Sequence, residues 1–160
     1  MKPRLNPYQA APEAMKAVGA LEAYVQGSGL EPSLVELIKM RSSQINGCAY
    51  CLHMHARDAR AKGESEERLY LLDAWRESPL YTDRERAALA WTEAVTNVRE
   101  GHVPDDVYEK VRNEFTEKEL ADLTLAIVTI NGWNRLNIAM RTVPGTYQPK
   151  AREIKKGAAH

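Results

Sequence analysis

No stretch of this chain approaches the run of about 18 apolar residues that a membrane-spanning helix requires. The start of the chain, residues 1–7, also lacks the apolar segment that forms the centre of a signal peptide. Lysine plus arginine and aspartate plus glutamate both number 22, so the formal net charge is zero. These absences predict a cytoplasmic protein whose main partner is neither a membrane nor a nucleic acid.

Phenylalanine and cysteine are scarce as well, with one phenylalanine and two cysteines in 160 residues. Alanine, leucine, glutamate and arginine are abundant, which favours helices over strands. No segment alternates apolar and polar residues with the two-residue period of a strand. The length suits one domain that can bury a hydrophobic core. We therefore expect a single all-α domain over residues 1–160.

Apolar residues at helical spacing, together with capping signals, predict a bundle of about seven helices with short connections. Residues 1–11 contain two prolines and are expected to form an extended arm, and residues 145–160 a mobile basic tail. The last helix is expected at the centre of the fold, because apolar residues surround it almost completely. The expected helices cover residues 12–26, 32–44, 48–62, 65–78, 82–95, a short segment around 107–115, and 116–141.

Both cysteines form one Cys-x-x-Cys pair, Cys48 and Cys51, and His55 follows the second cysteine by four residues. Positions three and four apart share a helix face, so these three side chains should lie together. Asn46-Gly47 should place Cys48 in the first turn of a helix, where free backbone N–H groups and the helix dipole favour a thiolate. The pattern suits a redox dithiol, with a helix-turn-helix carrying the motif and the imidazole moving the proton.

Two other interpretations of these residues stay open. Cys48, Cys51, His53 and His55 are all ligands that zinc accepts. Consecutive turns of one helix cannot surround a metal tetrahedrally, however, and His53 should point away from His55. The third interpretation is structural, with two small buried cysteines on a core helix and His55 as a hydrogen-bonded neighbour.

Glu36 lies twelve residues before Cys48, inside an apolar stretch that runs from Leu34 to Ile38. A carboxylate in such a stretch is expected to be half-buried and to need a partner. If the two helices form a hairpin, Glu36 can approach His55. The sequence then predicts a relay that runs from carboxylate to imidazole to thiol.

The spacing of Glu36, Cys48, Cys51 and His55 resembles the AhpD-like alkylhydroperoxidases of the carboxymuconolactone decarboxylase superfamily. The resemblance spans about residues 20–142 and includes segments 41–48, 55–60, 75–77, 85–89 and 131–135. It implies an AhpD-like helical fold that assembles as a homo-oligomer, a trimer or hexamer. It also implies that Cys51 attacks a peroxide, that Cys48 resolves the product, and that His55 and Glu36 relay the proton.

The helix-end argument by itself would make Cys48 the more acidic thiol, whereas the spacing to His55 and the resemblance both favour Cys51 as the attacking residue. One departure from the family pattern is Tyr50, because some members carry a histidine between the cysteines. A phenol is a poorer proton carrier than an imidazole at neutral pH. Trp133, Asn134 and Arg135 are interpreted chiefly as core packing and helix-end hydrogen bonds, with pocket lining as the alternative.

The resemblance implies a thiol-dependent peroxidase acting on alkyl hydroperoxides or hydrogen peroxide. No bound cofactor and no metal are expected. The reductant would be an external dithiol, which in some family members is carried by a lipoyl-bearing protein. Two alternative functions remain: a general disulfide oxidoreductase, and a non-catalytic redox-sensing oligomeric module. Lactone decarboxylation is not expected, because the decarboxylase branch typically lacks the cysteine pair.

Overall fold

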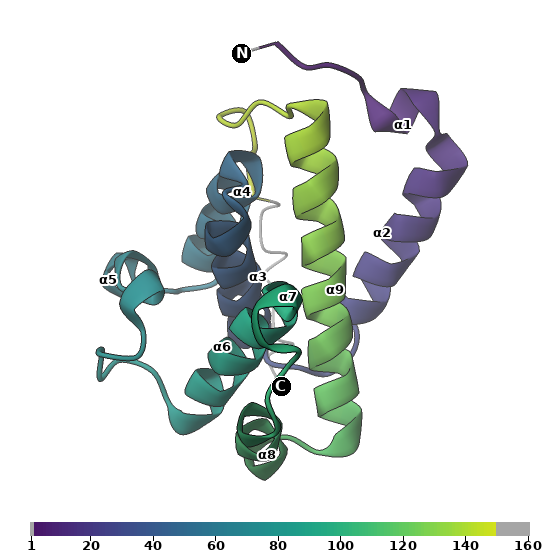
Figure 1. Ribbon diagram of the computed structural model, residues 1–160. Helices are drawn as coiled ribbons and strands as arrows, with labels where there is room; N and C mark the ends of the chain where they lie inside the picture. Colours follow the sequence, from purple (N-terminus) through teal and green to yellow (C-terminus); the bar gives the residue numbers. More distant parts are fainter. Residues whose placement is uncertain (1, 150–160) are drawn as a thin grey trace, which may run out of the picture.

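The computed structural model describes residues 2–149. Over these residues the chain forms nine α-helices, one 3-10 helix and no strand, which confirms the predicted all-α fold (Figure 1). The helices are α1 Pro7–Ala10, α2 Pro12–Gln26, α3 Pro32–Asn46, α4 Ala49–Ala61, α5 Glu66–Tyr70, η1 Leu72–Ala74, α6 Asp83–Thr96, α7 Val98–Gly101, α8 Asp105–Glu114 and α9 Glu117–Met140.

The seven expected helices correspond to α2 to α6, α8 and α9, and two short helices are additional. The arm at residues 1–11 contains one of them, α1, because the Asn6 side chain caps the backbone N–H of Tyr8 and Pro7 suits the first helical position. The other is the single turn α7. Residues 150–160 of the expected tail lie outside the described residues.

The continuous helix expected over residues 65–78 is wrong, because α5 ends at Tyr70 and the 3-10 helix η1 follows. Leu69, Leu72 and Trp75 are all buried against the same hydrophobic cluster. Their spacing of three residues matches the three residues per turn of a 3-10 helix. Leu72 lies in η1, between Leu69 of α5 and Trp75 at the C-cap of η1, and all three side chains reach the core.

Helix α3 is the most enclosed element, since every residue from Leu34 to Met40 is buried. One hydrophobic cluster joins its side chains Leu34 and Ile38 to α6, α8 and α9, and a second joins Leu37 and Met40 to α4, α5 and η1. The expectation that α9 would be central is confirmed only in part. Helix α9 packs against α2, α3, α4, α6 and α8, but its outer face leaves apolar residues such as Val128 half-exposed.

The connection between α3 and α4 is a tight turn at Gly47, whose φ of 68° is in the left-handed region. Glycine adopts this conformation without the steric cost that a Cβ imposes. The turn places Cys48 at the N-cap of α4. It thereby forms the predicted helix-turn-helix around the cysteine pair.

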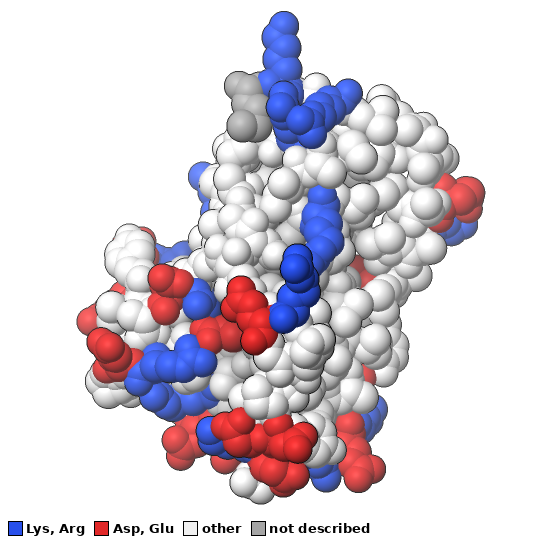
Figure 2. Space-filling view, viewed as in Figure 1, with Lys and Arg blue, Asp and Glu red and all other residues white. Residues whose placement is uncertain are grey.

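Helix α9 runs the length of the molecule, with α2 along one side of it and α3 and α4 along the other (Figure 1). Charged side chains gather toward one end of the molecule, over α5, α6 and α8, while the surface over much of α9 and α2 has few (Figure 2). None of the helices in residues 2–149 combines the length and the apolarity that crossing a membrane requires.

Gly47→Ala should lower the free energy of unfolding by about 1 kcal/mol, because alanine is strained in the left-handed region. No atom lies within 4 Å of the position that the new Cβ would take, so no clash adds to this cost. Urea unfolding monitored by circular dichroism measures the change. Gly19→Ala is the matched control, since Gly19 lies inside α2 with open space beside it and should gain stability instead. A Gly47→Ala protein as stable as the wild type would contradict the prediction.

Candidate active site

The two cysteines are free thiols whose Sγ atoms lie 2.6 Å apart. Cys48 is the N-cap of α4 and Cys51 lies in the first turn of that helix, so the three-residue spacing directs both sulfurs to the same side. Cys48 is 1% exposed and Cys51 is fully buried. A small side-chain adjustment would bring the sulfurs to the bonding distance of about 2.05 Å.

The two thiols differ in their pKa values. A hydrogen bond from the Cys51 side chain lowers the pKa of Cys48 to about 7, with further help from the backbone N–H groups of Cys51 and Tyr50 at the helix end. The hydrogen bond to Cys48, together with burial, raises the pKa of Cys51 in turn. The first proton therefore leaves from Cys48 near neutral pH, as the helix-end argument from the sequence predicts.

His55 and Glu36 form the hydrogen bond that the sequence predicts between the two helices of the hairpin. Nδ1 of His55 lies 2.9 Å from Oε2 of Glu36, and both side chains are buried. Nζ of Lys62 donates to the other carboxylate oxygen of Glu36 at 2.5 Å. Although burial raises the pKa of Glu36, the hydrogen bonds from His55 and Lys62 outweigh it and hold that pKa at about 2. The carboxylate therefore stays ionised at neutral pH.

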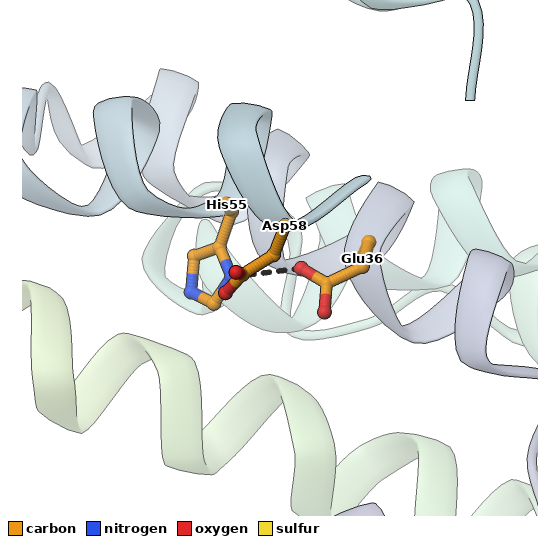
Figure 3. Close-up of side chains that lie close together, drawn as sticks. All are labelled: Glu36, His55 and Asp58. Carbon is orange, nitrogen blue, oxygen red and sulfur yellow. Dashed lines mark hydrogen bonds and ion pairs between the residues drawn. The ribbon is translucent and has the colours of Figure 1, made fainter. Parts of the chain in front are cut away.

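The hydrogen bond to Glu36 fixes the orientation of the imidazole. Because Nδ1 faces Glu36, Nε2 is directed to the opposite side of the ring and is free to exchange a proton (Figure 3). His55 lies one helical turn after Cys51 on the same face of α4. The arrangement suits a base that takes a proton from the thiol pair.

Asp58 joins this group, although the sequence analysis did not select it. It lies one turn after His55 on α4, and both of its carboxylate oxygens accept from the hydroxyl of Tyr147, at 2.7 and 2.9 Å. Glu36, His55 and Asp58 offer ligand atoms that lie within 4.8 Å of one another (Figure 3). Lys62 and Tyr147 already donate to the two carboxylates, so the protein itself satisfies this cluster. The spacing of Asp58 from His55 is the signal that could have found it.

The metal interpretation based on the cysteines gains no support from the geometry. Within residues 2–149, neither sulfur belongs to a group of three potential ligands, and His53 belongs to none either. Nδ1 of His53 is buried without a hydrogen-bond partner in the same residues. His53 also does not line the cavity described next.

A cavity of about 900 Å³ lies beside the hairpin, between α1 and α2 on one side and α9 and the segment after it on the other. His55, Glu36 and Tyr50 line it, whereas the two buried cysteines do not. Much of the lining is apolar, and includes Leu5, Tyr8, Met15, Trp133, Leu136 and Met140. Trp133 is thus a cavity residue, the alternative that the sequence analysis ranked second.

Tyr50, between the cysteines, lines the cavity in its phenol form. Burial raises its pKa, and the charges of neighbouring Tyr8 and the cysteines add to this rise. The hydroxyl therefore stays protonated at neutral pH. Tyr50 cannot replace the histidine of other members as a base there.

A network of amide side chains from α9 holds the base of the site. Nδ2 of Asn134 donates to Ser43 on α3 at 3.0 Å, and Nδ2 of Asn46 donates to Asn134 at 2.9 Å. Nδ2 of Asn137, one turn later, reaches Sγ of Cys51 at 3.6 Å. The network ties α9 to the turn that carries the cysteines, so Asn134 has the packing role that the sequence analysis favoured.

Comparison with known proteins identifies the family. The model of the carboxymuconolactone decarboxylase family matches residues 10–94. The chain belongs to this family. It is similar to the uncharacterized protein YdfG of Bacillus subtilis, with 45% identity over 140 residues that cover 88% of this chain and 95% of YdfG. It is also similar to the uncharacterized protein YnjA of Escherichia coli, with 32% identity over 123 residues that cover 77% of this chain and 66% of YnjA.

Solved structures of similar fold agree with this assignment. The crystal structure of ATU0492 from Agrobacterium tumefaciens, a protein of unknown function described as a candidate antioxidant defence protein AhpD, superimposes with a TM-score of 0.88. It shares 48% identity and covers 91% of this chain and all of its own. The debrominase Bmp8 shares 22% identity with a TM-score of 0.78, covering 86% of this chain and 74% of Bmp8, and shows the same fold. The fold of this protein is therefore AhpD-like.

Glu36→Gln should make the protein less stable at neutral pH and make its stability depend less on pH. The pKa of Glu36 lies at about 2 in the folded protein, against 4.5 for the free side chain, so its ionised form stabilises the fold above the higher value. This contribution, on the order of 3 kcal/mol, is lost as the pH falls through the window between the two values.

Urea unfolding at a series of pH values from neutral to about 3 measures both proteins. Glu119, whose pKa is also about 2, contributes equally to both, so the difference between the curves isolates Glu36. The difference in free energy of unfolding between the two proteins should shrink on acidification. Curves that stay parallel would show that Glu36 has no depressed pKa.

Proposed function

We propose that this protein is a thiol-dependent peroxidase that reduces hydroperoxides through a dithiol–disulfide cycle of Cys51 and Cys48. One observation carries the proposal: two free thiols lie in contact, one of them with a pKa near neutrality, behind a cavity lined by His55. Because Cys48 ionises near neutral pH, the thiol pair holds one negative charge, which Cys51 takes over when its proton passes to Cys48. Membership of the family and the likeness to ATU0492 support the same assignment.

In the first half of the cycle His55 takes the proton that leaves the thiol pair, and Glu36 holds the imidazole through Nδ1. The proton remaining on Cys51 passes to Cys48, across the short distance between the sulfurs, which leaves a thiolate on Cys51. This sulfur attacks the distal peroxide oxygen, so that an S–O bond forms and the O–O bond breaks. Sulfur loses two electrons to the peroxide, and the departing alkoxide takes the proton from His55.

In the second half Cys48 attacks the sulfenic acid on Cys51. An S–S bond forms, the S–O bond breaks, and the departing hydroxide leaves as water with the proton of Cys48. An external dithiol then reduces the disulfide by thiol–disulfide exchange. A protein-bound lipoyl group is one such dithiol. That it is the reductant of this protein stays a prediction.

The cavity favours an alkyl hydroperoxide over hydrogen peroxide as the substrate. Its volume of about 900 Å³ is far larger than hydrogen peroxide needs, and apolar side chains such as Trp133 and Met15 line it. An apolar substituent of the substrate would lose its contact with water there, which contributes binding free energy.

We also propose that the protein forms a homo-oligomer and that it is cytoplasmic. The outer face of α9 exposes Leu125, Val128 and Ile138, apolar side chains that a second copy of the chain would cover. The region over α9 and α2 that carries few charges supports the same proposal (Figure 2). Light scattering measures the oligomer number, for which the resemblance implies three or six.

Two alternative functions make different predictions for the same thiols. A general disulfide oxidoreductase would exchange disulfides without a preference for peroxides. A redox-sensing module would be oxidised once and would not turn over. Peroxide consumption in the presence of a small dithiol separates the three functions, because only the peroxidase consumes many equivalents.

Cys51→Ser should abolish peroxide turnover, whereas Cys48→Ser should allow one reaction and then stop. Without Cys48 no disulfide can form, so the sulfenic acid on Cys51 accumulates and reacts with dimedone. Mass spectrometry after one equivalent of cumene hydroperoxide locates the adduct. Sustained turnover by the Cys51→Ser protein, or an adduct on Cys48 of the wild type, would contradict the assigned roles.

The wild-type protein should use cumene hydroperoxide with a kcat/KM at least tenfold above that for hydrogen peroxide, since burial of an aromatic ring contributes about 1.5–3 kcal/mol. Steady-state kinetics with a small dithiol as reductant measure both values. The gain should lie mainly in KM, because binding of the apolar group is the difference. Equal kcat/KM values for the two peroxides would contradict the role proposed for the cavity.

A further inference from the structure

Among residues 2–149, Asn137 alone both lines the cavity and has a polar group within hydrogen-bond distance of a reacting sulfur. It lines the cavity, and its Nδ2 lies 3.6 Å from Sγ of Cys51. His55 and Tyr50 line the same cavity, but neither has a recorded hydrogen bond to a sulfur among the described residues. Asn137 therefore lies where a peroxide and the Cys51 sulfur would meet.

The orientation of the Asn137 amide follows from its second contact. Nδ2 also lies 2.9 Å from the backbone oxygen of Trp133. A carbonyl oxygen only accepts hydrogen bonds, so the NH₂ group and not the amide oxygen must face it. The NH₂ group has two hydrogens, and with one on Trp133 the other is available to the sulfur. The sulfur of Cys51 thus has a fixed N–H donor.

We propose that Asn137 is a catalytic residue of this site, whose side-chain N–H donates to Sγ of Cys51 and stabilises the negative charge on that sulfur before it attacks the peroxide. The inference rests on the proposed function for the nature of the reaction. The predicted effect of Asn137 on the pKa of the Cys51 thiol does not depend on it. A preorganised neutral donor stabilises charge that develops in a buried site, where water cannot do so.

The electrostatics of the pair support this role. The hydrogen bond and negative charge of Cys48, with burial, raise the pKa of Cys51, and hydrogen bonds from Asn134 and Asn137 oppose that rise. Asn134 is fully buried and also bonds Ser43, so its loss would loosen the contact between α9 and α3. Asn137 is partly exposed to the cavity, which makes its substitution the cleaner test.

The decisive measurement follows alkylation of Cys51 by iodoacetamide as a function of pH, in a Cys48→Ser background where Cys51 is the only cysteine. Asn137→Leu keeps the approximate size of the side chain and removes both donors. Asn137→Asp keeps the shape and presents only acceptors. Since a hydrogen bond to a charged group typically changes an equilibrium about tenfold or more, the thiolate fraction of both variants below the pKa should fall roughly tenfold.

Thr129→Val provides the matched control. Thr129 is a buried polar residue of the same helix that bonds only the backbone oxygen of Leu125 among the described residues, and valine has nearly its shape. Its alkylation profile should coincide with that of the Cys48→Ser parent. Thermal unfolding of every variant checks that α9 stays folded.

Peroxide kinetics on the otherwise wild-type chain supply the second readout. Asn137→Leu should lower kcat/KM for cumene hydroperoxide roughly tenfold at neutral pH. The loss should shrink at alkaline pH, where the thiol ionises without help. A merely structural residue would lower the rate equally at all pH values.

The outcomes separate the two proposals. An alkylation profile that neither Asn137→Leu nor Asn137→Asp shifts would overturn the role of Asn137, whatever the peroxidase activity. A shifted profile in a protein that consumes no peroxide would overturn the proposed function, and would leave Asn137 as the residue that stabilises the Cys51 thiolate.

Discussion

The buried carboxylate of Glu36 is the constraint on which the arrangement of the site depends. An ionised group that is 2% exposed destabilises the fold unless charged or polar partners compensate it. The partner His55 lies in α4 and Lys62 is the C-cap of that helix, so the pairing fixes how α4 sits against α3. The same pairing fixes the imidazole ring with Nε2 away from Glu36 (Figure 3). One turn back along α4, it also sets the position of Cys51.

The charged side chains of the site line the cavity, whereas the two thiols do not. The acidic and basic side chains Glu36, Lys62 and Asp58 line the cavity, whereas neutral donors surround the sulfurs: backbone N–H groups of α4 and amide side chains of α9. The hydrogen bond from the Cys51 side chain, helped by these neutral donors, lowers the pKa of Cys48 to about 7. Because nucleophilicity falls with the pKa of a thiol, a value near ambient pH suits a reactive pair better than a very low one.

The reactive groups and the cavity lining come from different parts of the chain. The region that matches the family model, residues 10–94, contains Glu36, both cysteines and His55. Much of the cavity wall lies outside it, in the N-terminal arm and in α9 and the segment that follows. Variation of the wall around a retained site offers a physical route to different substrates on one fold. The debrominase Bmp8 has this fold at 22% identity.

The sequence by itself determined the all-α class and the pairing of Glu36 with His55. The first follows from local spacing, and the second from the need of a buried carboxylate for a partner. Only the tertiary structure decided that α3 is the most enclosed helix and that Asp58 and Asn137 join the site. Tyr147 and α9 are far from the cysteines along the chain, and nothing in local periodicity says which face they cover. Contacts between distant segments depend on how whole helices pack, which short-range patterns do not encode.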